Sequence, residues 1–282
     1  MAHDMTHTPD RLRALERFRE LHESGTFVMP NPHDTGTAKL LAAIGFQALA
    51  TTSQGFANSI GQLDSTVTRD QLVAHVRAIC SAAAVSADAR ALPVNVDAER
   101  CFPEAEGGVA RTVELLAAAG AAGCSIEDWN PVDRHVEPLN VAIERVAEAV
   151  AAARRVGMVI TARAENLIRG VNDLDDTLAR LSAYVHAGAE VVYAPGLVDL
   201  EQIRRAVAAT SQPMNVLMLP GGPTVADLTR VGVRRISLGS VLSTAAYGAF
   251  ARAAQQLFAE GSLSPDNAYL PRKLEQQAFG PR

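Results

Sequence analysis

The stretch PVNVDAER, residues 93–100, has the pattern of a short buried strand that ends in two acidic residues. Its apolar residues and Pro93 come first, and Asp97 and Glu99 follow two positions apart. Residues two apart on a strand face the same side, so both carboxylates are expected on one face. Short strands that are almost continuously apolar are typical of sheets covered on both sides by helices. This stretch therefore predicts a strand of a buried parallel sheet.

Similar strands recur along the chain, with helical patterns between them. The predicted strands are residues 26–29, 48–53, 93–98, 123–128, 158–164, 190–195, 214–219 and 234–240. The predicted helices that follow them are residues 36–45, 68–83, 109–120, 139–157, 173–188, 198–209, 224–231 and 241–259. Several of these helices end at a glycine, which is a common C-terminal cap. Strands that alternate with helices predict a parallel sheet.

Eight such units predict an α/β fold, a (β/α)8 TIM barrel that forms one domain over residues 1–282. The alternative is an open doubly wound sheet. That fold normally has a glycine-rich phosphate turn after its first strand, whereas PNPHDTG (30–36) follows here. An extra N-terminal helix is expected over residues 10–23. Residues 1–9 are expected to be disordered, and residues 260–282 to form a C-terminal helical arm or tail.

Composition excludes several classes of function. Hydrophobic residues make up 48% of the 282 residues, which is enough for a large core, and the formal charge of −5 comes without a basic stripe. We therefore expect no nucleic-acid partner. Three cysteines without CxxC spacing argue against a disulfide framework or a structural zinc site. The chain has no signal-peptide pattern and no long apolar run, so we expect a soluble cytoplasmic protein without membrane contact.

Polar residues collect where the strands end, which is the active-site end of a barrel. In chain order they are Asn31, His33, Asp34, Thr52, Ser53, Gln54, Asp64, Asp97, Glu99, Glu127, Asp128, Arg163, Glu165 and Tyr193, and Asn215 begins the seventh strand. Carboxylates that converge on one mouth repel one another unless a cation lies among them. Hard oxygen ligands without a His or Cys cluster indicate Mg²⁺, with Mn²⁺ as an alternative. The metal ligands are then predicted to be Asp97, Glu99 and Glu127.

Arg163 offers a planar fork for a carboxylate or phosphate of the substrate. A metal beside an arginine suits a 2-oxo acid, because the metal can stabilise the enolate formed when a carbon–carbon bond breaks. His33 and His135 lie in loops where they could donate protons. Cys101 could be a nucleophile, or simply a small residue in a tight loop. Asp128 and Asp34 could each be the cap of the next helix.

Four blocks of the sequence resemble the isocitrate lyase/phosphoenolpyruvate mutase superfamily. They are VNVDAER (94–100), GAAGCSIED (120–128), ITARAE (160–165) and PMNVLMLPGGP with GVRRISLG (213–223 and 232–239). The resemblance runs from about residue 26 to 255. It implies a Mg²⁺-dependent barrel that acts on a 2-oxo acid or enolpyruvyl substrate. It also implies a homo-oligomer, a dimer or a tetramer, in which the last helix is exchanged between neighbours.

The resemblance also implies roles for single residues. Asp97 would be the direct metal ligand, and Glu99, Glu127 and Asp64 would hold the water molecules of the metal. The substrate would be bound by Thr52, Ser53 and Gln54 at one end and by Arg163 at the other. Asn215 is a further candidate for substrate binding. The candidate catalytic residues are Asp64, Arg163 and His135.

The chain departs from its apparent relatives in the loop after the fourth strand. Isocitrate and methylisocitrate lyases carry a KKCGH motif there, whereas this chain has WNPVDRHVEPL (129–139) without Lys or Cys. The mutase and hydrolase members use a loop lysine that is also missing, and the family usually has Gly where Cys101 stands. The first hypothesis is therefore a Mg²⁺-dependent carbon–carbon lyase or decarboxylase for a small 2-oxo or 2-hydroxy dicarboxylate. In this hypothesis Arg134 or His135 gates the site or supplies a proton. The alternatives are phosphonopyruvate-type P–C chemistry and a barrel that binds a metabolite without catalysis.

Overall fold

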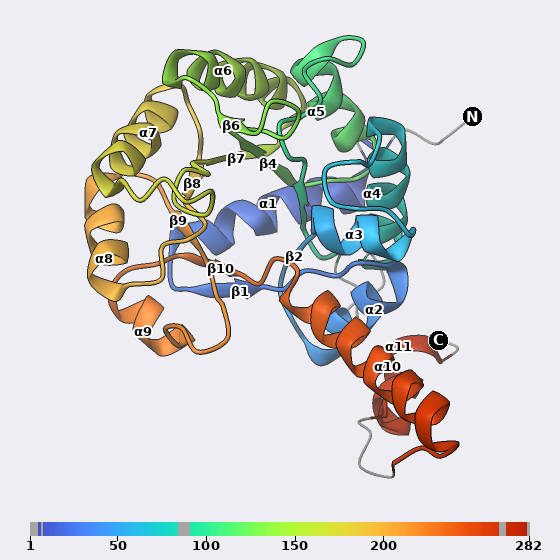
Figure 1. Cartoon of the computed structure of the whole chain (residues 1–282). Coiled ribbons are helices and arrows are strands. Elements are labelled where there is room, and N and C mark those ends of the chain that lie inside the picture. The colour runs from blue at the N-terminus through green and yellow to red at the C-terminus, as the bar shows by residue number, and fades with distance from the viewer. Residues whose placement is uncertain (1–4, 7, 84–90, 265–268, 281–282) are drawn as a thin grey trace.

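The chain folds into a barrel of eight parallel strands, which confirms the predicted fold class (Figure 1). The computed structural model describes residues 5–6, 8–83, 91–264 and 269–280. The barrel strands are β1 (Phe27–Met29), β2 (Leu49–Ala50), β3 (Val94–Asp97), β4 (Gly123–Glu127), β7 (Val159–Arg163), β8 (Val191–Tyr193), β9 (Met214–Leu217) and β10 (Arg235–Ser237). The hydrogen-bonded order is β1-β10-β9-β8-β7-β4-β3-β2. The barrel is nearly closed, because Ala50 donates its backbone N–H to Pro30 beyond the end of β1 at 3.0 Å.

Most of the helices surround the barrel on its outer side (Figure 1). The helices of the described chain are α1 (Pro9–Glu23), α2 (Thr35–Ile44), α3 (Ser53–Ser59), α4 (Arg69–Ala83), α5 (Gly108–Ala118), α6 (Leu139–Val156), α7 (Leu174–His186), α8 (Leu200–Ala209), α9 (Val225–Arg230), α10 (Val241–Glu260) and α11 (Arg272–Phe279). In the part of the chain that the structure describes, none of them is both long and apolar enough to cross a bilayer. Each predicted strand and helix has a counterpart within a few residues.

Three elements were not predicted from the sequence. Helix α3 occupies the start of the loop after β2, and β5 (Trp129–Asn130) pairs antiparallel with β6 (His135–Val136) in the loop after β4. Helix α11, by contrast, lies in the segment that was expected to form a C-terminal helical arm or tail, and it contacts α2. The predicted disorder of residues 1–9 falls partly on residues 1–4 and 7, which lie outside the described residues. Within the same segment, Met5 donates its backbone N–H to Ala118 at 3.0 Å.

Helix α1 packs against the end of the barrel opposite the predicted site. Its Phe18 is fully buried in a cluster that includes residues of β1, β7 and β8. The close approach of Phe18 explains the glycine at the start of β4. A Cβ on Gly123 would lie 2.8 Å from the Val159 carbonyl oxygen and 2.9 Å from a ring carbon of Phe18. These contacts leave no room for a side chain, so α1 and β7 fix glycine at this position.

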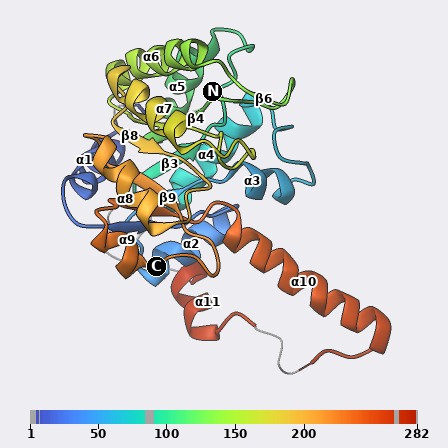
Figure 2. The ribbon, with the colours of Figure 1, turned by 60° about the vertical axis from the view of Figure 1, so that its left-hand side comes forward.

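Helix α10 leaves the barrel instead of packing along it (Figure 2). Of its twenty residues only Ser243 is buried. Its exposed large apolar residues are Leu242, Tyr247, Phe250, Leu257 and Phe258, and Phe258 is 94% exposed. An apolar surface of this kind on a long helix marks an interaction site in soluble proteins.

Candidate active site

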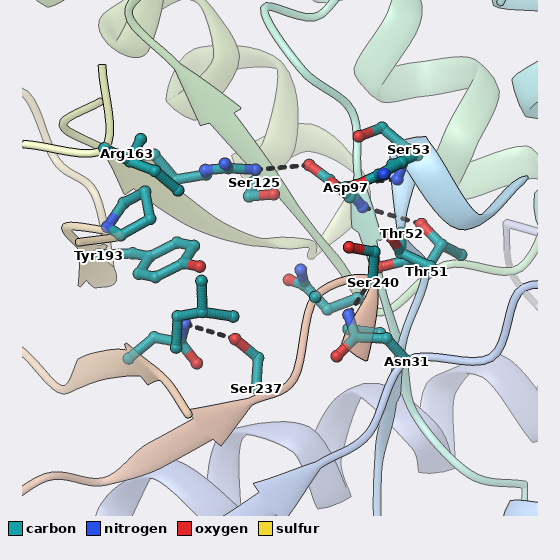
Figure 3. Close-up of a pocket in the computed structure, with 18 of the residues that line it drawn as sticks. Asn31, Thr51, Thr52, Ser53, Asp97, Ser125, Arg163, Tyr193, Ser237 and Ser240 are labelled. Carbon is teal, nitrogen blue, oxygen red and sulfur yellow. Dashed lines mark hydrogen bonds and ion pairs between the residues drawn. The ribbon is translucent and has the colours of Figure 1, made fainter. Parts of the chain in front are cut away.

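A pocket of about 260 Å³ opens at the carboxyl ends of the barrel strands (Figure 3). The predicted site residues that line it are Thr52, Ser53, Gln54, Asp64, Asp97, Arg163 and Asn215. They come from β3, β7, β9 and the segment after β2, so four of the eight strand–helix units contribute to the pocket. Of the other three predicted site residues, Glu99 and Glu127 lie against this cluster behind the pocket wall, whereas His135 lies away from the pocket in β6.

Arg163, at the end of β7, is the centre of the ion-pair network. Its Nη1 donates to Asp97 Oδ1 at 2.7 Å and lies 3.2 Å from Glu127 Oε2. Its Nε and Nη2 both donate to Glu165 Oε1, at 3.1 Å and 2.7 Å. The guanidinium carbon also lies 5.1 Å from the centre of the Tyr193 ring. Burial alone would lower the pKa of Arg163, but the three carboxylates outweigh it and raise that pKa, so the group stays charged.

Asp97 is held from two sides at the end of β3. Arg163 binds one of its carboxylate oxygens, and the backbone N–H of Ser53 donates to the other at 3.1 Å. The backbone N–H of Asp97 donates to the Thr51 hydroxyl at 2.9 Å, which fixes the end of the strand (Figure 3). The Ser53 N–H, which was predicted to bind substrate, therefore positions Asp97 in this structure.

Glu99, Glu127 and Asp64 experience strong mutual repulsion. Burial, followed by the charges of Asp97 and Asp64, raises the pKa of Glu99 to about 8. Burial and the charge of Asp97 also raise the pKa of Asp64. Burial and the nearby carboxylate of Glu165 raise the pKa of Glu127, against the opposing effect of Arg163. The carboxylates of this cluster, which include Asp97 and Glu165, outnumber the two arginines that pair with them, Arg163 and Arg169.

This donor set fits a hydrated divalent cation. The donors are hard carboxylate oxygens, and a cation among them would relieve the repulsion that raises their pKa values. Among the described residues no three acidic, histidine or cysteine side chains are arranged to ligate one ion directly. Mg²⁺ usually keeps several of its water molecules and binds through one or two carboxylates, and the cluster offers carboxylates of this kind.

The loop after β4 is a short hairpin whose first residue, Trp129, packs on Arg169 in the pocket wall, and we call residues 129–137 the lid hairpin. Its last residue, Glu137, is buried and contacts Arg100 at 3.3 Å, Arg145 at 3.2 Å and Asn130 at 3.2 Å. The Glu137 backbone N–H donates to the Asp128 carbonyl at 2.7 Å. His135 Nε2 lies 3.3 Å from Glu137 Oε2, so its ring faces Glu137.

Two other sequence candidates are buried away from the pocket. Cys101 is fully buried beside Cys124, and contact with that thiol and burial raise its pKa well above its usual value. A thiol in this state is a poor nucleophile. His33 is 7% exposed, and its ring lies 5.6 Å from that of Tyr247 in α10. Asp34 caps α2, as one of its two predicted roles required.

Cys101 lies in an unusual backbone segment. The φ angles of Glu99, Cys101 and Phe102 are 49°, 59° and 49°, in the left-handed region that favours glycine. The resemblance implied glycine at position 101, and this backbone conformation explains why. Strain of this kind costs about 1–2 kcal/mol per residue. It is retained where the surroundings fix the backbone, which is common at functional sites.

The substrate-binding candidates Thr52 and Asn215 also have partners within the protein. Thr52 is the N-cap of α3 and accepts from Gly55 N–H at 3.3 Å. Asn215 is buried, donates to Ser237 Oγ at 2.9 Å and accepts from Arg235 Nε at 2.9 Å. Gln54, by contrast, is exposed in the pocket wall. The hydrogen bonds of Thr52 and Asn215 thus hold the pocket wall in place.

Sequence reasoning missed Arg169, which also lines the pocket. Its guanidinium carbon lies 4.4 Å from the centre of the Trp129 ring. The signal in the sequence was its position, four residues after Glu165 in the loop that follows β7. That spacing brings an arginine back to the carboxylate when the loop forms a helical turn.

Comparisons with known proteins agree with this architecture. The profile of the family described as phosphoenolpyruvate phosphomutase matches residues 18–258. The 2-methylisocitrate lyase of Escherichia coli K12 is 33% identical over 186 residues, 63% of this chain and 60% of that protein. The 2,3-dimethylmalate lyase of Eubacterium barkeri is 29% identical over 204 residues, 69% of this chain and 67% of that protein. A crystal structure from Burkholderia cenocepacia J2315, provisionally described as a lyase/mutase, is 42% identical with a TM-score of 0.88 and covers 97% of this chain and 98% of its own.

Proposed function

Because the chain belongs to the phosphoenolpyruvate phosphomutase family, we propose that it is a metal-dependent carbon–carbon lyase or decarboxylase. Its substrate would be a small 2-oxo or 2-hydroxy dicarboxylate, cleaved through a pyruvate-enolate-like intermediate. The observation that carries the proposal is the group of carboxylates around Arg163 at the mouth of the pocket. Relatives named 2-methylisocitrate lyase and 2,3-dimethylmalate lyase support a lyase activity.

The cofactor in this proposal is Mg²⁺, with Mn²⁺ as an alternative. Asp97 would hold it directly, and Glu99, Glu127 and Asp64 would bind its water molecules. When bound there, a divalent cation would polarise the carbonyl or hydroxyl oxygen of the substrate. Burial raises the pKa of Glu99 to about 8, and the charges of Asp97 and Asp64 add to this effect, so a cation at this place would interact favourably with the carboxylates.

Arg163 and the segment of residues 52–54 would position the substrate. Arg163 is charged, and its guanidinium lies against Tyr193 at the pocket wall. A fixed positive charge in a partly buried pocket stabilises the negative charge that develops as the carbon–carbon bond breaks. Asp64 also lines the pocket and is our second catalytic candidate. His135 faces Glu137, so its predicted role would require the lid hairpin to move.

The test is turnover of oxaloacetate, 2-methylisocitrate and 2,3-dimethylmalate by the purified chain with Mg²⁺. Pyruvate release above the rate of the metal alone, abolished by EDTA, is the expected result for at least one of them. Asp97→Asn should lower that rate by at least a hundredfold. Asp70→Asn, which changes an aspartate on the first turn of α4, should leave it unchanged. If no pyruvate forms from any of the three, the lyase proposal is wrong.

Two further measurements, phosphorus NMR and oxalate binding, separate the other two hypotheses. The family profile carries the name of a phosphomutase, which favours including phosphonopyruvate among the substrates. A shifted phosphorus NMR resonance would replace the lyase by P–C chemistry. Metal-dependent binding of oxalate without turnover of any substrate would instead favour a metabolite-binding barrel.

We also propose that the protein is a homo-oligomer, a dimer or a tetramer, in which α10 packs against a second copy. The support is the exposed apolar side of a helix that leaves its own barrel. Phe258→Glu places a charge on the most exposed of these residues and should lower the molar mass measured by light scattering. An unchanged mass for this variant and for Phe250→Glu would exclude α10 as the contact.

A further inference from the structure

Arg169 lines the pocket beside Ile168, at the outer end of the cavity that contains Arg163. Its side chain is 33% exposed, against 13% for that of Arg163. Its closest ion-pair partner is Glu165 Oε2, 3.2 Å from Nη2, and Glu127 Oε1 follows at 4.0 Å. Among the described residues no other carboxylate lies within ion-pair distance of Arg169. A guanidinium has five N–H donors, and both of these ion pairs are made by Nη2, so Nε and Nη1 have no carboxylate partner among the described residues.

Arg163 differs from Arg169 in this respect. Carboxylates contact its Nε, Nη1 and Nη2, which leaves it few donors for a substrate with two carboxylates. The two arginines share Glu165, one on each of its oxygens. One carboxylate therefore lies between their charged ends, hydrogen-bonded to Arg163 and ion-paired with Arg169. A short dicarboxylate that is held at Arg163 can thus reach Arg169 with its far end.

The position of Arg169 is fixed before any ligand binds. Its guanidinium packs on Trp129, the first residue of the lid hairpin, at 4.4 Å from the ring centre. Glu137 fastens the other end of that hairpin to Arg100 and Arg145. The backbone N–H of Arg169 donates to the Glu165 carbonyl at 3.0 Å. A charged group that is already held in place loses little conformational entropy when it binds an anion.

The apolar neighbour of Arg169 fits the same kind of ligand. Ile168 is 47% exposed and lines the same pocket as Arg163 and Arg169. An apolar side chain there suits the short hydrocarbon part that links two carboxylates. A charge-assisted, partly desolvated contact at Arg169 would recognise the second of them.

We propose that Arg169, on the Trp129 ring and beside Ile168, is the subsite for the distal carboxylate of the substrate. It selects dicarboxylates over monocarboxylates of the same 2-oxo or 2-hydroxy type. This inference rests on the proposed function, because it assumes that the pocket binds such acids. In this proposal the loop after β7 binds the distal carboxylate. The lid hairpin is short and contains no lysine that could do so.

The experiment compares malate with lactate, two 2-hydroxy acids that differ in the distal carboxylate. Dissociation constants are measured by calorimetry with Mg²⁺ for the full chain, with oxalate as a third ligand that lacks a distal group. The proteins are the wild type, Arg169→Gln, Arg169→Lys and Arg205→Gln, a matched change of a surface arginine on α8 that pairs with Asp175. Thermal unfolding of each variant checks that it is folded. If Arg169→Gln is not folded, Arg169→Lys replaces it in the comparison of malate with lactate.

Arg169→Gln should weaken malate binding by about tenfold or more, since hydrogen bonds to charged groups contribute about 1.5–3 kcal/mol. Lactate and oxalate should change by less than about twofold, and Arg169→Lys should keep part of the malate affinity because it keeps the charge. Equal losses for malate and lactate, or no loss for malate, overturn the subsite and leave the proposed function intact. A wild type that binds oxalate but prefers lactate to malate also overturns it. A wild type that binds none of the three acids with Mg²⁺ overturns both.

Discussion

Glu137→Gln tests whether ion pairs hold the lid hairpin in place. Glu137 is 7% exposed and accepts from Arg100, Arg145 and Asn130, so its carboxylate connects the hairpin to the loop after β3 and to α6. Glutamine has nearly the same shape but carries no charge. The substitution therefore removes the charge while it keeps the volume, and it leaves Arg145 without a carboxylate partner among the described residues.

The expected loss is larger than that for a surface ion pair. Removing one member of a buried pair costs about 3–5 kcal/mol, because the other charge stays buried. Glutamine can still accept a hydrogen bond from one arginine, and Arg100 keeps Glu104 at 2.9 Å. We therefore expect the free energy of unfolding at pH 7 to fall by about 3 kcal/mol. Glu104→Gln removes an exposed partner of the same arginine and should cost less than about 1 kcal/mol.

Urea denaturation followed by circular dichroism measures both variants. Trp129 is the only tryptophan of the chain and lies in the lid hairpin, so its fluorescence reports whether the hairpin keeps its native position. Glu137→Gln should shift the emission of the folded protein to longer wavelength, because a loosened hairpin exposes the indole. The native spectrum of Glu104→Gln should match that of the wild type. Equal losses of stability in the two variants would refute the reasoning.

The difference between wild type and Glu137→Gln should also depend on pH. Burial tends to raise the pKa of Glu137, but the hydrogen bond and charge of Arg145 and the charge of Arg100 outweigh it and lower that pKa below 4.5. A carboxyl whose pKa is lower in the folded state stabilises the protein above the pKa of the unfolded chain. The difference should thus be constant above about pH 5.5 and shrink as the pH falls below 4.5. A difference that grows on acidification would contradict this sign.

Three further substitutions test other parts of the fold by urea denaturation. Tyr184→Phe removes a buried hydroxyl that donates to Asp128 at 2.6 Å, and it should cost about 1.5–3 kcal/mol; a cost below 0.5 kcal/mol would show that this bond does not matter. Gly123→Ala places a methyl group 2.8 Å from the Val159 carbonyl oxygen and should lower the free energy of unfolding by about 1–3 kcal/mol. An unchanged denaturation midpoint would mean that the neighbouring atoms move apart to accommodate the methyl group. Cys101→Gly should be about 1 kcal/mol more stable than Cys101→Ala, because glycine adopts the left-handed conformation without strain and alanine does not. The opposite order of stability would show that the backbone at position 101 is not strained.

The fold was predictable because local pattern and global architecture agree. Each barrel strand is short and largely apolar, the predicted helices have an amphipathic period, and a parallel barrel is the closed arrangement of eight such units. Helix α3 was missed because residues 53–59 contain Gly55 and polar residues instead of an amphipathic repeat. The lid hairpin was missed because β5 and β6 have two residues each, too few to form a recognisable pattern.

The residues of the candidate site were predictable, but their partners were not. The strand-end rule brought Asp97 and Arg163 to one mouth, and the structure pairs them at 2.7 Å. The same rule could not show that the Ser53 N–H binds Asp97, or that Glu165 engages one side of Arg163. Such contacts depend on rotamers and on loop positions a few ångströms apart. Sequence spacing does not encode these details, because partners such as Asp97 and Arg163 are 66 residues apart.

The loop after β3 connects the acidic cluster to the lid hairpin. Arg100 lies between Glu99, whose carboxylate belongs to the acidic cluster, and Cys101, whose backbone is strained. Its side chain binds Glu137 of the lid hairpin at 3.3 Å, and the Glu99 carbonyl accepts from the Glu127 N–H at 2.9 Å. The left-handed φ angles on both sides of Arg100 restrict the backbone that carries this contact. The lid hairpin thus contacts the acidic cluster at two places, through Arg100 next to Glu99 and through Trp129, which packs on the Arg169 that pairs with Glu165 and Glu127.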